Sequence, residues 1–194
     1  MTWFSGLVLA IALVSPQSAP LRLNEEVRSL LEQNRNADAV AAGRQALGSS
    51  EATLGHRHPV TAMVLRNLAL AYERTGSYNR AEAEARESVR ILESLFGSHD
   101  ASLVAPLNVL TETFAGQRRF MDAMKMARRA IAIGPDAGLH YAIALQNLGA
   151  LYEIEGRPQD ARRYYTEALS VRESLLPVSN EIAENGPLER RSSR

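Results

Sequence analysis

An internal repeat is the feature that most constrains the fold of this chain, because copies of one helical pattern at a fixed period stack into an elongated array. The segment Arg66-Asn-Leu-Ala-Leu-Ala-Tyr72 resembles Gln146-Asn-Leu-Gly-Ala-Leu-Tyr152, and Phe114 marks a third copy between them. Counted in residues, the interval from Tyr72 to Phe114 is 42 and the interval from Phe114 to Tyr152 is 38. The copies therefore remain in register, although the second interval is shorter.

The period also locates the shortening and the start of the array. The residues that the second interval lacks are missing after Ile133, where Gly134-Pro135-Asp136 ends a helix early. Counting back one full period from Tyr72 leads to Leu30. We therefore expect a fourth, degenerate unit at the start, with Gly48 interrupting its second helix. Such a unit serves as an N-terminal cap, because an end face has no neighbour to cover it.

Within each unit the apolar residues recur at helical spacing. Leu65, Leu68, Ala69 and Tyr72 stand at positions i, i+3, i+4 and i+7, which predicts one buried stripe on a first helix. A second stripe follows after the turn glycine Gly76, so each unit is an antiparallel helix pair. The sequence predicts helices at about residues 22–34, 37–54, 59–75, 78–96, 101–116, 119–133, 139–155 and 158–175.

One turn departs from this pattern. In the third unit, Arg118 stands where the sister units have Gly76 and Gly156. Arg118 thus replaces the glycine that belongs to the turn of the repeat. Gly116 lies two residues earlier and is an alternative source of the turn.

These residues resemble the tetratricopeptide repeat, and more closely the long variety found in kinesin light chains and many bacterial proteins. The resemblance rests on Leu65-Arg-Asn-Leu-Ala-Leu-Ala-Tyr72, on Gly76-Ser-Tyr-Asn-Arg-Ala81 and on Leu54-Gly-His-Arg-His-Pro59, and it extends over about Leu21 to Leu176. It implies an all-α, right-handed solenoid of antiparallel helix pairs, with about three full repeats and a degenerate N-terminal one. It also implies a module that binds other proteins, and not an enzyme.

A stacked array of this kind has a concave surface lined by its first helices. In the family, the Asn after the leading Leu commonly touches the backbone of a bound extended peptide, which would give Asn67 and Asn147 that role. The alternative is that these Asn side chains only bridge neighbouring helices. The residues that we expect to line a peptide-binding groove are Met63, Arg66, Asn67, Leu70, Arg74, Asn108, Val109, Glu112, Ile143, Gln146, Asn147 and Ala150.

Composition excludes several classes of function. Lys and Arg number 22, as do Asp and Glu, so the chain has no surplus positive charge to attract nucleic acid or an anionic membrane. Cysteine is absent, which excludes disulfides and thiolate chemistry. No glycine-rich phosphate loop and no catalytic motif is present. We therefore expect no cofactor, no catalytic residue and no nucleic-acid partner.

The four histidines raise the question of a metal site. His56, His58 and His99 could approach one another at adjacent repeat junctions. However, His58-Pro59 stands where the family opens a helix, and Asp100 stands at the matching place one period later. We expect these residues to serve the helix starts, and we expect no metal.

The two ends of the chain differ from the repeats. Trp3 to Val14 is an apolar run that is followed by a stretch with small residues and proline, which predicts a secretory signal over residues 1–20. The run is too short to span a bilayer. A signal would place the protein outside the cytoplasm, in the periplasm or the medium, and the alternatives are an uncleaved N-terminal anchor or a cytoplasmic protein. The tail, 177–194, has no apolar period and is predicted to be disordered.

The sequence leaves two functions from different classes open. The first is a module that occupies residues 21–176 and holds a protein or peptide segment in the concave groove. The second is a homo-oligomeric structural scaffold, held at a membrane by an uncleaved N-terminal segment. No polar capping helix follows Leu176, so the last repeat has a face that self-association would cover.

Overall fold

The computed structural model describes residues 18–176, which form helices joined by short turns and no strand. The signal segment predicted over 1–20 lies largely outside the described residues, and the tail predicted over 177–194 lies wholly outside them. The α-helices are α1 (Ala19–Glu32), α2 (Asn36–Leu54), α3 (Pro59–Arg74), α4 (Tyr78–Phe96), α5 (Val104–Gly116), α6 (Phe120–Ile133), α7 (Leu139–Ile154) and α8 (Pro158–Leu175). Short 3-10 helices, η2 (Ala101–Leu103) and η3 (Pro135–Ala137), precede α5 and α7.

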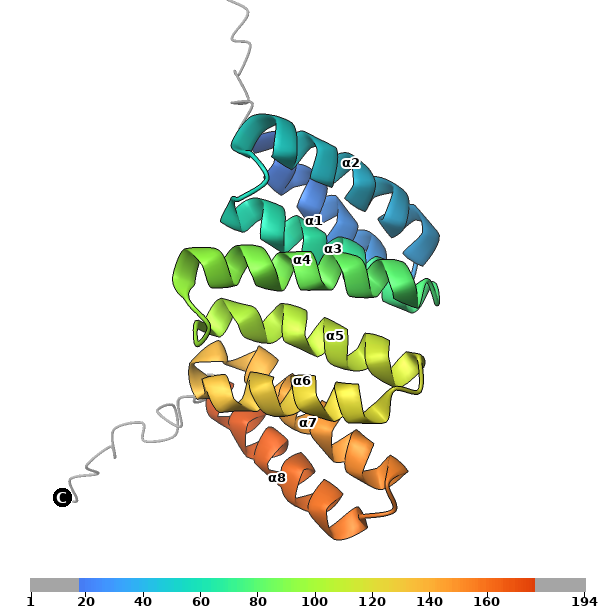
Figure 1. Ribbon diagram of the computed structural model, residues 1–194, viewed down its shortest axis with the longest axis vertical. Helices are drawn as coiled ribbons and strands as arrows, with labels where there is room; N and C mark the ends of the chain where they lie inside the picture. The colour runs from blue at the N-terminus through green and yellow to red at the C-terminus, as the bar shows by residue number, and fades with distance from the viewer. Residues whose placement is uncertain (1–17, 177–194) are drawn as a thin grey trace, which may run out of the picture.

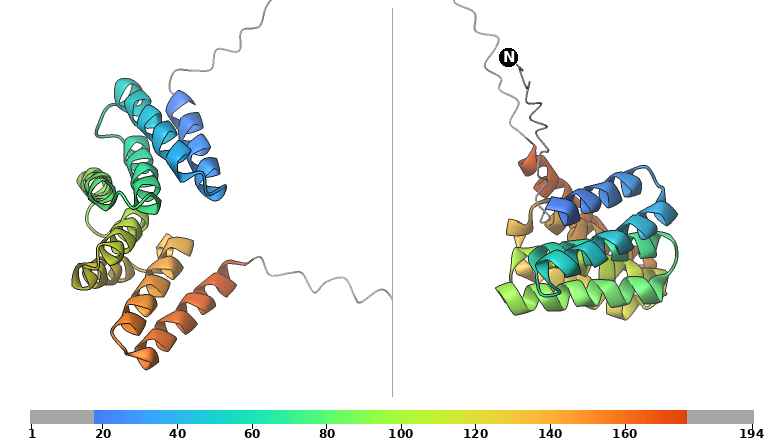
Figure 2. Two further views of the ribbon diagram at one scale, coloured as in Figure 1. Left: turned by 90° about the vertical axis from the view of Figure 1, so that its right-hand side faces the viewer. Right: turned by 90° about the horizontal axis from the view of Figure 1, so that it is seen from above.

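The helices pack as four antiparallel pairs, α1 with α2, α3 with α4, α5 with α6 and α7 with α8 (Figure 1). Each odd-numbered helix also contacts the next odd-numbered helix, and each even-numbered helix contacts the odd-numbered helix that follows it. The pairs follow a curved path with α4 and α6 on its outer side (Figure 2). The predicted solenoid of helix pairs, including a fourth unit at the start, is confirmed.

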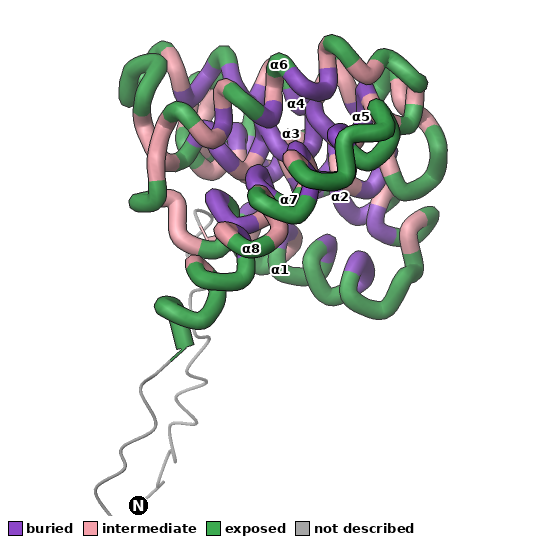
Figure 3. The backbone as a smooth tube through the Cα atoms, turned by 90° about the horizontal axis from the view of Figure 1, so that it is seen from below, coloured by how far each residue is buried: buried purple, intermediate pink, exposed green. Residues whose placement is uncertain are grey.

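The buried residues form the seam between the two layers of helices (Figure 3). Small residues at the same place in the second helix of each unit let the helices approach closely, and Ala39, Ala81, Ala123 and Ala161 are all at most 1% exposed. A large residue of the first helix fills the seam beside them, and Phe114 is only 2% exposed. The guanidinium of Arg119 lies 4.3 Å from the centre of the Phe114 ring, which is close enough for a cation–π contact.

The turn between the two helices of a pair has the same geometry in all four units. Its central residue is Asn34, Gly76, Arg118 or Gly156, with φ angles of 57°, 73°, 61° and 73°. Arg118 therefore takes the left-handed conformation that glycine takes in two sister units, although this conformation is strained for a residue with a side chain. The alternative that Gly116 supplies this turn is wrong, because Gly116 is the last residue of α5.

Gly116 has a different reason to be glycine. A Cβ atom on it would lie 2.4 Å from the Tyr78 ring, which is too close for any substitution without a shift of that ring. The position therefore serves the approach of α4 to α5.

Two helix starts are capped by the residues that the sequence singled out. The His58 Nδ1 atom accepts a hydrogen bond of 3.1 Å from the Val60 amide at the start of α3, next to Pro59 at the first helical position. The Asp100 carboxylate accepts one of 2.9 Å from the Ser102 amide at the start of η2. Both side chains satisfy amide groups that have no partner within the helix.

The helix ends agree with the predicted ranges to within a few residues. The largest differences are at the start of α5, where η2 takes the first predicted residues, and at α1, which begins at Ala19 with the buried Pro20 in its first turn and ends at Glu32. The predicted domain boundary at residue 20 thus falls inside α1. Helix α6 ends at Ile133, as expected from the residues missing after it.

Candidate functional site: the concave face

The odd-numbered helices line the concave face, because they contact one another along the array while α4 and α6 lie outside (Figure 2). Side-chain bonds join neighbouring odd-numbered helices across this face. Asn67 Nδ2 on α3 donates to Asn24 Oδ1 on α1 over 2.7 Å, and Asn147 Nδ2 on α7 donates to Glu112 Oε1 on α5 over 3.1 Å. These bonds fix the relative positions of the first helices of successive units.

The predicted groove residues fall into two groups by exposure. The larger group can be reached from solvent and comprises Met63, Arg66, Leu70, Arg74, Glu112, Ile143, Gln146, Asn147 and Ala150. The other three, Asn67, Asn108 and Val109, are 2%, 4% and 5% exposed. These three side chains are therefore buried in the contact between units and offer little surface to a ligand.

The bonds of the Asn residues bear on the two roles weighed for them. Asn67 and Asn147 both make the bridging contact between neighbouring helices. A peptide contact by Asn147 stays a prediction that its half-buried position allows. For Asn67 it also stays a prediction, but it requires the buried bond to Asn24 to open. Asn108, one place out of register, donates to the His140 carbonyl over 2.8 Å.

Arg66 is the most unusual charged residue of this face. It is half-buried, and no hydrogen bond or ion pair joins its guanidinium to any residue between 18 and 176. Burial, and secondarily the charge of Arg28, lower the pKa of Arg66. His140 lies near it, and burial together with the Arg66 charge lowers the pKa of His140. Arg66 is thus a desolvated cation with a second cation nearby and no counter-ion.

The other charges of the face are balanced locally. Arg74 donates to the Leu31 carbonyl over 2.7 Å, at the end of α1, where the helix dipole is negative. Burial raises the pKa of Glu112, while the hydrogen bond from Asn147 and the charge of Arg74 act in the other direction. Burial, and then the charge of Glu112, also raise the pKa of Glu73. Glu73 and Glu112 therefore lie close to Arg74, and Glu32 lines the same depression as Arg66 without forming an ion pair with it.

Two depressions meet at Arg66. One, of about 300 Å³, lies between α1 and α3 and includes Arg28, Leu70 and Arg74. The other, of about 270 Å³, has a mainly apolar lining and extends from Met63 to residues at the end of α4 and the start of α5. Phe96, whose side chain is 50% exposed, lies at the edge of this depression.

Four residues of this face, Arg28, Phe96, His140 and Arg172, were not predicted from the sequence. The period places Arg28 at the same point of its unit as Leu70, so the repeat alone could have identified it. Phe96 and His140 lie near helix ends, outside the apolar stripes that define the repeat. Arg172 belongs to a second helix, yet its guanidinium donates to Gln146 Oε1 over 2.6 Å.

Outside the concave face, Arg119 and Arg129 form ion pairs with neighbouring acids. Within residues 18–176, no three His, Cys, Asp or Glu side chains are grouped so that they could hold a metal ion. Arg119 pairs with Glu82 and Asp122, at 2.9 Å and 2.7 Å, and Arg129 pairs with Glu93. No described helix is both long and apolar enough to cross a membrane.

A curved stack of helix pairs with a solvent-accessible inner face defines a helical-repeat protein. Tetratricopeptide repeat models match residues 23–94 and residues 142–180, which together make up more than half of the chain. The chain belongs to the tetratricopeptide repeat proteins. Repeats of this family generally mediate contacts between proteins, and the family is typically non-catalytic.

The relatives found by sequence are kinesin light chain-related proteins of Arabidopsis thaliana. Protein KINESIN LIGHT CHAIN-RELATED 3 is 24% identical over 146 residues, which cover 73% of this chain and 22% of that protein. Protein KINESIN LIGHT CHAIN-RELATED 1 is 26% identical over 137 residues, which cover 69% of this chain and 22% of that protein. The chain therefore spans less than a quarter of the length of these relatives.

Solved structures share the fold. BtubC (BKLC) from P. vanneervenii superposes with a TM-score of 0.70 at 21% identity, covering 93% of this chain and 70% of that one. A putative kinesin light chain with nearly identical TPR-like repeats from Podosopora anserina superposes with a TM-score of 0.65 at 19% identity, covering 86% and 80%. At this level of identity the likeness establishes the solenoid architecture.

Proposed function

We propose that the chain is a binding module that holds an extended segment of another protein along its concave face. The general role of the family supports a protein partner. The single observation that carries the proposal is Arg66, a half-buried cation without a counter-ion at the meeting point of two depressions.

The chemistry around Arg66 suggests which side chains the partner carries. An incoming carboxylate would pair with a guanidinium that has already lost part of its hydration, so little further desolvation opposes the contact. A hydrogen bond to a charged group contributes about 1.5–3 kcal/mol. We expect an Asp or Glu of the partner at this point.

The apolar depression next to Arg66 supplies the second anchor. Met63, Leu92 and Pro106 line it, and the exposed ring of Phe96 borders it. A large apolar side chain that enters it removes apolar surface on both partners from water. The proposed ligand is therefore a segment with an acidic residue next to a large apolar one.

A random-peptide library displayed on phage tests the proposal. The full chain serves as bait, and the affinities of the selected peptides are measured by fluorescence polarisation. We expect selected peptides to combine an acidic and an apolar residue, and Arg66→Ala to weaken their binding by about tenfold to a hundredfold. The matched control is Arg162→Ala, which removes an exposed arginine from α8 and should leave affinity unchanged. Equal losses in both variants would show that general positive charge, and not the groove, holds the peptide.

A specific observation also favours the self-associating scaffold. Leu169, Leu175 and Leu176 on and after α8 are 57%, 50% and 66% exposed, on the last helix of the described array. A second copy that covered them would give an oligomer without any other partner. Light scattering of the purified chain separates the two functions, because the binding module is expected to be monomeric and the scaffold oligomeric.

A further inference from the structure

The 42-residue period places equivalent side chains at equivalent junctions, so the first and second junctions between outer helices can be compared directly. At the second junction, Arg129 on α6 forms an ion pair with Glu93 on α4. Subtracting the period maps Arg129 to Glu87 on α4, and Glu93 to Glu51 on α2. The first junction therefore has two carboxylates where the second has a cation and a carboxylate.

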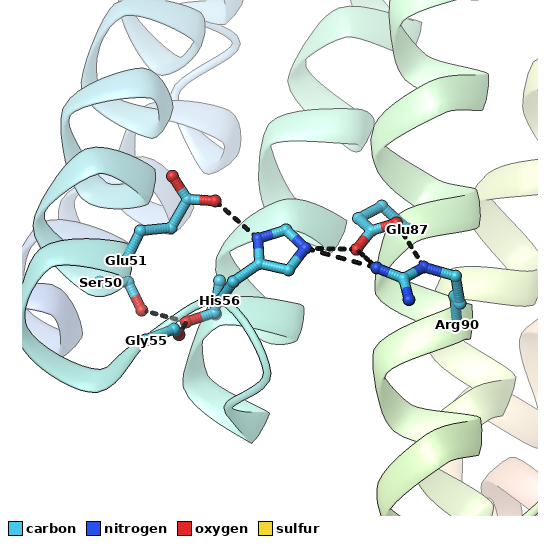
Figure 4. A network of polar contacts seen from close by, with 7 residues as sticks. Ser50, Glu51, Gly55, His56, Glu87 and Arg90 are labelled. Atoms are coloured by element: carbon cyan, nitrogen blue, oxygen red, sulfur yellow. Dashed lines mark hydrogen bonds and ion pairs between the residues drawn. The ribbon is translucent and has the colours of Figure 1, made fainter.

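An imidazole separates these two carboxylates. His56, in the turn between α2 and α3, has its Nδ1 atom 2.8 Å from Glu51 Oε1 and its Nε2 atom 2.5 Å from Glu87 Oε1 (Figure 4). The residue at the equivalent point of the second junction is Ser98, which has no such reach. His56 thus links the two carboxylates at the first junction. The second junction needs no such residue, because Arg129 and Glu93 pair directly.

The other charged groups around His56 lie on α4 and in its own turn. On α4, Arg90 binds Glu87 with its Nε atom at 2.8 Å, and its terminal nitrogen lies 3.5 Å from His56 Nε2, where it opposes protonation. Glu84, also on α4, has a raised pKa because of burial and the charges of Glu51 and Glu87. Within its own turn, His56 adjoins Arg57, which is exposed.

We propose that His56 is a pH-dependent strut between the first two repeats. As an imidazolium it donates to Glu51 of α2 and to Glu87 of α4 and holds them together. The neutral ring has only one N–H, so its other nitrogen faces a carboxylate as acceptor against acceptor, and α2 and α4 move apart. The second junction, closed by Arg129 and Glu93, does not respond to pH in this range, because arginine stays protonated. The curvature of the concave face between α1 and α3 would then depend on pH, whereas the rest of the array would not.

The direction of the pH dependence follows from the contacts. The hydrogen bond to Glu51, and then the one to Glu87, raise the pKa of His56 above its ordinary value of 6.5. A raised pKa means that the folded state binds the proton more tightly than the unfolded state does. The stabilisation is therefore complete below pH 6.5 and is lost as the pH rises through the folded-state pKa of His56.

The first experiment measures the titration of His56 directly. The imidazole resonances of the full chain are followed by NMR, and the His56 signals are assigned with His56→Ser. We expect His56 to titrate above 6.5, and we expect Glu51→Gln and Glu87→Gln each to move the midpoint down. Arg129→Gln, at the second junction, should not move it. A midpoint at or below the ordinary value, or one that neither Gln variant changes, would overturn the proposal.

The second experiment measures the movement itself. The chain has no cysteine, so pairs of introduced cysteines can be spin-labelled without background. The exposed positions Ala41, Ala83 and Lys125 are equivalent in successive units. The 41–83 pair spans the first junction and the 83–125 pair spans the second. We expect the 41–83 distance to lengthen as the pH is raised from about 6 through the His56 transition found by NMR, and the 83–125 distance to stay constant.

A matched variant provides the control for other titrating groups. His56→Ser combined with Glu87→Arg rebuilds the first junction with the residue types of the second. In this variant we expect the 41–83 distance to be short and independent of pH. If wild type shows the same constancy, or if the variant lengthens as wild type does, His56 is not the strut.

Discussion

Phe114 and Arg118 lie four residues apart, yet substitutions at these two positions should have opposite effects on stability. Phe114 fills the seam between the layers and is 2% exposed, with Arg119 stacked on its ring at 4.3 Å. Phe114→Ala removes this buried ring and leaves a cavity, at a cost of about 3–5 kcal/mol. For a chain of this length each kcal/mol shifts the melting temperature by about 2–4 °C, so the midpoint should fall by roughly 6–20 °C.

Arg118→Gly should raise the midpoint instead. Arg118 has a φ of 61° and an exposed side chain, so the substitution relieves backbone strain without uncovering the core. The left-handed conformation costs a residue with a side chain about 1–2 kcal/mol of stability, which the substitution to glycine recovers. Glycine also has a more flexible unfolded state, which lowers the free energy of unfolding by about 0.5–1 kcal/mol. A net gain of about 0.5–1 kcal/mol remains, or roughly 1–4 °C.

Thermal unfolding followed by circular dichroism at 222 nm measures both variants against the parent chain. Asn34→Gly is the matched control, because Asn34 has a φ of 57° at the same point of the first unit, and asparagine tolerates this conformation better than arginine does. Its midpoint should change less than that of Arg118→Gly. Equal midpoints for Phe114→Ala and Arg118→Gly would refute the register of the third unit on which the reasoning depends.

Two helix glycines, a buried amide pair and the N-terminal segment give the remaining predictions. Gly149→Ala should destabilise the fold by about 1–3 kcal/mol in urea unfolding, because the new Cβ atom would lie 2.7 Å from the Tyr165 ring. Gly48→Ala should instead stabilise the fold by about 0.5–1 kcal/mol, because a Cβ atom there meets no other atom. Asn67→Ala should cost about 1–3 kcal/mol because it leaves Asn24 buried without a donor, and the double variant Asn24→Ala with Asn67→Ala should cost less than the sum of the singles. Protein recovered from its native host should begin near residue 20 and lie outside the cytoplasm, and an intact mass that includes Met1, from the soluble cytoplasm, would contradict this.

The helices and their order could be predicted from the sequence, because the repeat is recognised from residues that recur at fixed intervals. Each buried stripe, such as Leu65, Leu68, Ala69 and Tyr72, needs only its own helix to be recognised. The same counting placed Arg118 at a turn, and the structure shows that the turn keeps its left-handed geometry even without glycine. Local signals therefore determined most of the fold.

The contacts between units could not be predicted in the same way. The partner of Asn67 is Asn24, which lies in the unit that departs most from the pattern, so no motif indicates the pair. Arg66 lacks a counter-ion because no acid among the described residues pairs with it in the folded chain, which the sequence alone does not reveal. The contact between His56 and Glu87 joins residues that are 31 positions apart in the sequence. Pairing across units depends on side-chain direction and burial, which a repeat pattern describes only on average.

Photo-crosslinking of a selected peptide tests the central claim, that the concave face is the binding surface, most directly. Benzoylphenylalanine is placed at Leu70 or Ile143 on the concave face, or at Ala83 or Lys125 on the outer helices, and each variant is irradiated with a phage-selected peptide carrying a fluorophore. We expect labelled adducts from positions 70 and 143, abolished by an excess of unlabelled peptide, and none from 83 and 125. Competed adducts from 83 or 125, with none from 70 and 143, would show that the partner binds the outer helices and would contradict the account.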